Sequence, residues 1–390
     1  MNEKLKKKLF LFLRLVISFG LIGYIFYSLH AAGKLHELPA YFASANYWWL
    51  LLAALLLLGL LAAGSLRWGM LLGAQGIHLS RISVFMYYMI GMFLNNFLPS
   101  TVGGDFVKAY YLSKATGKTA GSFISVLVDR LMGMGGLCVV AVAACLLGGA
   151  NLWQNPETHA YALPIFLIVG GVSIGLVLFF LVVFNDRVLN ICLKLSRSDK
   201  PEEPLKETLQ QATSKGRIYI FKRRFSDLLR KIGEKIREFH QSMYIYKGQG
   251  KILFLTLLIS TLIWVVIVLV SWMVYMAFHT GGEVGSPGYI ASIPIRYFYI
   301  FLPVISVIMS LPISFAGLGV REGVFIKLFE TVPGNAISDV DALILSLTFY
   351  FVFLSVSLIG GVIYIFKDKL RVHRDIIFPP SPEVLSGEEK

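Results

Sequence analysis

The sequence lacks the short motifs that mark the common enzyme classes. Its 390 residues contain no HExxH, GxSxG or GxxxxGK[ST] pattern. Three cysteines are present without a CxxC spacing, and the seven histidines are scattered over loops and the ends of apolar segments. We therefore expect no catalytic triad, no nucleotide-binding P-loop, no metal site and no cofactor.

Acidic residues are also scarce. The chain has 23 Asp and Glu against 36 Lys and Arg, which gives a net charge of +13. In a soluble protein this excess would suggest nucleic acid. Here the basic residues gather in the N-terminal tail, one central loop and the C-terminal tail, and no aromatic-interleaved basic motif of an RNA binder appears. We expect these segments to face anionic lipid at the cytoplasmic surface and to bind no nucleic acid.

Hydrophobic residues make up 56% of the chain, above the roughly 45–50% typical of soluble domains. Six apolar runs approach or exceed the ~20 residues that a helix needs to cross a bilayer. They lie at 9–29, 47–72, 120–149, 163–184, 251–278 and 342–366. The strong apolar bias without alternation favours helices over a β-barrel. The sequence predicts an all-α, multi-pass protein of a bacterial-type cytoplasmic (inner) membrane.

Two further apolar segments, 82–118 and 295–330, are each broken by proline, glycine and charged residues. If the first crossed fully, the lysines after its break would lie outside, against the positive-inside rule. We predict two re-entrant helical hairpins that enter from opposite faces, as inverted repeats produce, with both termini cytoplasmic. The alternative is a topology of eight or nine full spans, because a hairpin and a pair of crossings leave the chain on the same side of the membrane.

This topology divides the chain into four parts. Residues 1–184 form a first membrane half and 251–367 a second. Between them, 185–250 is a basic cytoplasmic loop. Its apolar residues recur at helical spacing, which predicts an amphipathic helix on the inner leaflet or on the protein's own cytoplasmic face. Residues 368–390 form a cytoplasmic tail.

Polar groups at membrane depth are costly and are usually functional or paired. Those near the two breaks form a candidate headgroup-binding set: Asn96, Asp105, Lys108, Asp129, Arg130, Ser314, Arg321 and Glu322. The residues that break the backbone are Pro99, Gly103, Gly104, Pro312, Gly317 and Gly319.

The charged members of this set have distinct expected roles. Asp105 should open a short helix and lies on the same face as Lys108, so the two can pair. Arg321 best suits a lipid phosphate because its planar fork binds phosphate bidentately, with Glu322 either orienting or neutralising it. We expect Asp105 and Arg321 to approach one polar cavity from opposite faces of the membrane.

Asp129 and Arg130 are neighbours in sequence and do not share a helix face. Each therefore needs a different partner. The two expectations are contact with substrate and a buried structural ion pair with the opposite hairpin.

Three of these segments resemble the flippase-like membrane domain of the lysylphosphatidylglycerol synthase family. They are residues 96–105, which read NFLPSTVGGD, then 125–133 and 311–323. The resemblance covers nearly the whole chain. It implies movement of a lipid with a charged or glycosylated headgroup between leaflets. The expected lipid is an anionic phospholipid, an aminoacyl-lipid or a polyprenyl-phosphate glycan.

In the synthases this domain precedes a soluble aminoacyl-transferase domain, and the present sequence ends at Lys390 without one. We therefore expect a transporter-like protein rather than an enzyme. Two alternatives stay open. One is a membrane-embedded transferase acting on lipid headgroups, and the other is a scaffold that recruits a lipid synthase through residues 185–250. A homodimer and a separate synthase enzyme are the protein partners left open.

Overall fold

The computed structural model describes residues 38–97, 103–154, 156–185, 239–280, 289–310, 319–330 and 337–366, with single residues at 23, 27, 30, 187 and 332. The chain divides into two compact units. The first combines parts of 1–174 and 252–390, and the second is 175–251. Every regular element in the described residues is helical, which confirms the all-α part of the predicted fold class.

Five of the described helices are long and apolar enough to cross a membrane. The spans are Tyr47–Ala74 (α3), Thr119–Leu147 within α6 (Thr119–Gln154), Ala162–Val183 within α7 (Pro156–Val183), Gly250–His279 (α11) and Asp339–Phe366 (α14). Each exceeds the ~20 residues needed at 1.5 Å per residue. They match five of the six predicted spans, and the sixth, 9–29, lies outside the described residues except for positions 23 and 27. The chain is a multi-pass membrane protein.

The first broken segment folds as two helices, α4 (Arg81–Phe97) and α5 (Gly103–Thr116). The helices pack antiparallel, because the start of α5 lies against the middle and end of α4. A Cβ at Gly104 would collide with the Gly91 carbonyl oxygen and lie 2.6 Å from the Asn95 nitrogen. Only glycine therefore allows the two helices to approach this closely. The Asn95 side-chain oxygen also accepts a hydrogen bond from the Gly104 N–H at 2.8 Å.

The second broken segment also folds as two antiparallel helices, α12 (Ile295–Ser310) and α13 (Val320–Phe329). Phe329 at the end of α13 lies against Phe298 and Phe301 near the start of α12, with ring centroids 5.1 and 5.3 Å apart. Gly319, with φ of 80°, precedes α13 in a backbone conformation that favours glycine. Both breaks occur where the sequence predicted them, while the re-entrant orientation of the hairpins remains a prediction.

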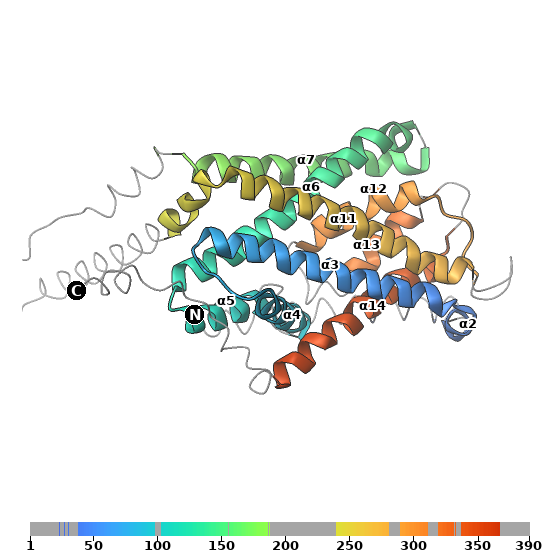
Figure 1. The fold of residues 1–390 in the computed structure, drawn as a ribbon. Helices are drawn as coiled ribbons and strands as arrows, with labels where there is room; N and C mark the ends of the chain where they lie inside the picture. Colours follow the sequence, from blue (N-terminus) through green and yellow to red (C-terminus); the bar gives the residue numbers. More distant parts are fainter. Residues whose placement is uncertain are drawn as a thin grey trace, which may run out of the picture. The chain divides into compact units, whose positions relative to one another are not determined.

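Helix α14 joins the two hairpins within the first unit. It packs on α4, α3 and α13, while α12 packs on α6 (Figure 1). A short helix, α2 (Leu38–Ser44), is tied to α14 through the Tyr41 hydroxyl, which donates to Asp341 at 2.6 Å. The main apolar core lies among α3, α11, α12, α13 and α14. Met89 of α4 also belongs to this core, whereas the buried apolar residues of α5 pack in a second cluster with α3, α4 and α6.

The second unit is described in three short stretches: the end of α7, residues 239–244, and a 3₁₀ turn (η2, Ile245–Gly248) that leads to α11. The Tyr244 ring lies between His240, with which it stacks, and Lys247. The predicted amphipathic helix in 185–250 falls mostly outside the described residues.

Candidate functional site

Five charged side chains from α3, α5 and α6 form the first charge cluster: Arg67, Asp105, Lys108, Asp129 and Arg130. Asp129 accepts a hydrogen bond from Arg67 Nε at 2.9 Å and lies 3.8 Å from Lys108 Nζ. Asp105 bonds Arg130 Nε and lies 3.5 Å from Lys108 Nζ. Three cations thus surround two carboxylates.

Aromatic rings and hydroxyl groups complete the first charge cluster. Lys108 Nζ lies 4.3 Å from the centre of the Trp68 ring and 4.8 Å from that of Tyr88, an arrangement that stabilises a desolvated cation. The Arg67 guanidinium also donates to Ser260 of α11 at 2.9 Å. Every charge in this cluster except that of Arg130 is buried. Such a network is strongly destabilised when one partner is removed.

The second charge cluster is smaller and local to the start of α13. Glu322 is 1% exposed and accepts both the Gly319 N–H, at 2.7 Å, and Arg321 Nη2. Arg321 Nε also donates to Ser346 Oγ of α14 at 3.3 Å. The guanidinium carbon lies 4.2 Å from the centre of the Tyr350 ring. Glu322 therefore orients Arg321, and the Arg321 side chain packs against α14.

One cavity of about 500 Å³ has walls from both hairpins and from α3, α6, α11 and α14. Its volume is typical of small-molecule sites, roughly 300–1,000 Å³. Most of its wall is aliphatic or aromatic. Its charged and small polar members are Asn96, Arg130, Ser271, Ser306, Arg321 and Ser346. The described residues that line it include no acidic side chain, so its charge is positive.

Comparison with known proteins identifies the family. The model of the lysylphosphatidylglycerol synthase TM region matches residues 11–361. The chain belongs to this family. A UPF0104 membrane protein of Pyrococcus horikoshii is 25% identical over 316 residues, which cover 79% of this chain and 84% of the relative. A UPF0104 membrane protein of Methanothermobacter thermautotrophicus is 23% identical over 280 residues, covering 70% and 72%. No solved structure matches the chain.

The predicted site residues fall into three groups: those that line the cavity, those that are buried, and those outside the described residues. Asn96, Arg130 and Arg321 line the cavity. Asp105, Lys108, Asp129 and Glu322 are buried beside it and hold its arginines or one another. Four of the predicted residues lie outside the described residues: Pro99, Pro312, Ser314 and Gly317.

Two expectations about these charges are corrected. Arg130 and Asp129 do find separate partners, but those partners come from α3 and α5 in the first half of the chain, not from the opposite hairpin. Asp105 is not among the residues that line the cavity; its partner Arg130 reaches the cavity instead. Asp129 and Arg130 have different partners because neighbouring residues on α6 point about 100° apart.

The sequence reading missed three residues that complete the clusters. Arg67 was not among the predicted site residues, and it is 6% exposed and bound to Asp129. Its position inside the apolar run of α3 was the available signal. Ser346 and Tyr350 of α14 carry no sequence signal, since hydroxyl groups are common in membrane helices. Within the described part of the chain, no group of three His, Cys, Asp or Glu side chains could hold a metal ion.

Proposed function

We propose that this protein moves a lipid with a charged or glycosylated headgroup between membrane leaflets, and that the headgroup occupies the cavity between the two hairpins. The observation that carries the proposal is the lining of that cavity, where Arg130 and Arg321 are the only charged groups among the described wall residues. Arginines at this depth, without an acidic neighbour in the wall, favour an anionic ligand such as a phosphate.

The composition of the wall supports a lipid rather than a soluble anion. Phe325, Phe349 and Phe353 give the cavity a broad apolar surface beside the two guanidinium groups. Such a wall accommodates the glycerol or polyprenyl part of a lipid while the arginines hold its phosphate. Serine hydroxyls and the Asn96 amide add hydrogen-bonding groups for a sugar or aminoacyl substituent. Transport would be downhill or coupled to an ion gradient.

The test is leaflet exchange of a fluorescently labelled phosphatidylglycerol in vesicles that contain the purified full chain. We expect Arg321→Gln to slow exchange by about tenfold or more, because it removes charge-assisted hydrogen bonds to the phosphate. Lys327→Gln is the matched control: it removes one cation from the same helix, but its side chain is 66% exposed. We expect exchange in this control to equal that of the wild type.

Arg130→Gln, on α6, provides a second test at the other charged residue of the cavity wall. It should also slow exchange, but with a lower thermal stability, because Asp105 loses its partner. Wild-type exchange no faster than that of empty vesicles, or equal rates in the wild type and Arg321→Gln, would contradict the proposal. A covalently modified lipid that forms only with intact protein would instead favour a headgroup transferase.

A further inference from the structure

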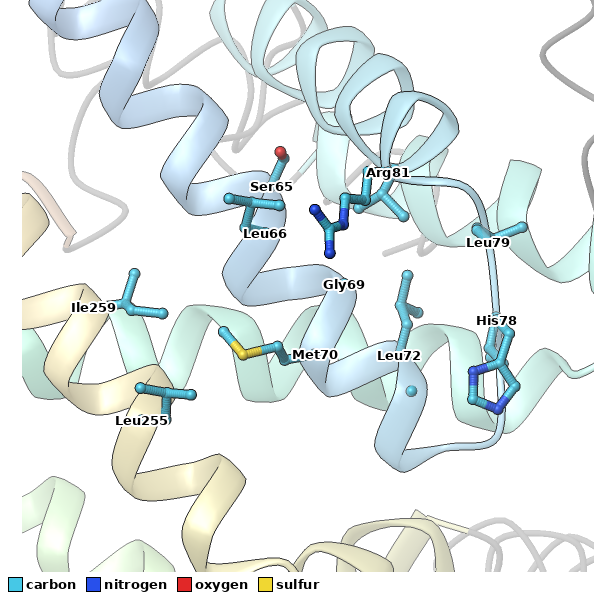
Figure 2. Close-up of a pocket in the computed structure, with 13 residues that line it drawn as sticks. Ser65, Leu66, Gly69, Met70, Leu72, His78, Leu79, Arg81, Leu255 and Ile259 are labelled. Atoms are coloured by element: carbon cyan, nitrogen blue, oxygen red, sulfur yellow. The ribbon is translucent and has the colours of Figure 1, made fainter.

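A second cavity, of about 490 Å³, lies away from the headgroup cavity at the other end of α3. Its wall combines the last turns of α3, the loop before α4, the first turn of α4 and the first turns of α11 (Figure 2). It shares no wall residue with the headgroup cavity. Since α3 ends and α11 begins here, the groove lies where two spanning helices reach the same membrane surface.

One wall of this groove is apolar. Leu66 and Met70 of α3 and Leu255 and Ile259 of α11 line it, and Figure 2 shows Met70 pointing toward the two α11 side chains. Leu66 and Leu255 are exposed in the protein alone, with 50% and 44% of their surface accessible. At the edge of a membrane protein, such surface is covered by lipid chains.

The other wall is basic. The exposed Arg81 side chain extends toward Leu66 and Gly69 of α3 (Figure 2). Within the described part of the chain, no hydrogen bond or ion pair engages its guanidinium. His78 lies on the same loop, and Lys118 donates to the Gly76 carbonyl of that loop at 2.9 Å. None of the 13 wall residues is acidic.

We propose that this groove binds one anionic phospholipid, with its phosphate on Arg81 and an acyl chain along Leu66, Met70, Leu255 and Ile259. A free, planar guanidinium is suited to bidentate contact with a phosphate. Basic pockets between membrane helices at the cytoplasmic surface bind anionic headgroups. The site is separate from the translocation cavity, and the proposal does not depend on lipid transport.

Native mass spectrometry of the detergent-solubilised full chain tests the proposal, with phosphatidylglycerol, phosphatidylcholine and inorganic phosphate as three separate probes. We expect the wild type to retain one phosphatidylglycerol in the groove, besides any in the headgroup cavity, and to retain it more strongly than phosphatidylcholine. Arg81→Gln should weaken that binding by about tenfold. The matched control is Arg296→Gln, an exposed arginine at the start of α12 and outside the groove, which should bind as the wild type does.

Gly73→Leu blocks the groove without touching its charge. A Cβ at Gly73 meets nothing within 4 Å, so the leucine side chain can occupy the cavity without displacing protein atoms. We expect it to abolish the same binding event as Arg81→Gln, at a thermal stability without lipid equal to or above that of the wild type, because leucine favours a helix more than glycine does. Equal binding of phosphatidylglycerol by all four proteins would overturn the proposal. So would equal retention of phosphatidylcholine, or phosphate competing as effectively as the lipid.

Discussion

The two charge clusters use similar residues in opposite ways. The first joins α3, α5 and α6, and four of its five charges are buried against one another. The second consists of neighbouring residues on α13, where buried Glu322 holds an arginine that faces the cavity. Removing a charge from the first therefore breaks contacts between helices, whereas removing Arg321 breaks mainly its contacts with Glu322, Ser346 and Tyr350.

This difference separates structural from functional charges in one membrane protein. A charge is retained in the membrane when it is paired or when it serves a ligand. The buried carboxylates of both clusters are paired, and the two arginines of the cavity wall are both paired and proposed to contact the ligand. Burial alone does not distinguish the proposed ligand-binding residues, whereas their position in the cavity wall does.

The largest expected effect is on the first charge cluster. Asp129→Asn removes the carboxylate that pairs with both Arg67 and Lys108. Because this leaves the two buried cations without that partner, we expect it to lower the free energy of unfolding by about 3–5 kcal/mol. Denaturation of the purified protein by SDS in mixed micelles measures this loss. Asp339→Asn, which removes an exposed carboxylate at the start of α14, should cost under about 1 kcal/mol. Equal losses in the two variants would show that the first cluster does not hold the helices together.

A glycine from each hairpin gives the next comparison. Gly104→Ala forces a methyl group against the backbone of α4 and should destabilise the protein by about 1–3 kcal/mol. Gly323→Ala lies in the helix that carries the second cluster, where a Cβ meets nothing within 4 Å. It should stabilise the protein by about 0.5–1 kcal/mol through helix propensity. Thermal unfolding distinguishes the two, and loss of stability in both would contradict the open environment of Gly323.

The smallest expected effect is at the edge of the second cluster. Ser346→Ala removes the hydroxyl that accepts from Arg321 Nε, and we expect lipid exchange to slow about two- to fivefold, with little change in stability. Ser355→Ala is the control on the same helix, since that hydroxyl is exposed and bonds only the Phe351 carbonyl of its own helix. Identical exchange rates for the two variants would remove Ser346 from the site.

Much of the architecture could be predicted from the sequence. Helix α4 ends at Phe97, α5 begins at Gly103 and α13 begins at Val320. The proline and glycine residues of the two broken segments predict these positions. The helix-opening position of Asp105 and its pairing with Lys108 were also predicted, and the structure confirms both. These features depend on local geometry, over which sequence spacing is informative.

The partners of Asp129 and Arg130 could not be predicted in the same way. Arg67 lies 62 residues before Asp129, and no periodicity relates them. Ser346 and Ser260, which contact the two clusters from α14 and α11, resemble many other hydroxyl residues in the spans. Such contacts depend on how each helix is rotated about its axis, and packing between helices decides that rotation.

The sequence by itself determined that the chain is helical, which segments are long enough to cross the membrane, and where two of them break. The physical reason is that a chain in lipid must satisfy its backbone hydrogen bonds within each helix, so apolar length and breaking residues suffice. The tertiary structure alone decided which charges from different helices bind one another and which face the cavity. Close approach of α4 and α5 at Gly104 sets the position of Asp105, and the contact with α14 directs Arg321.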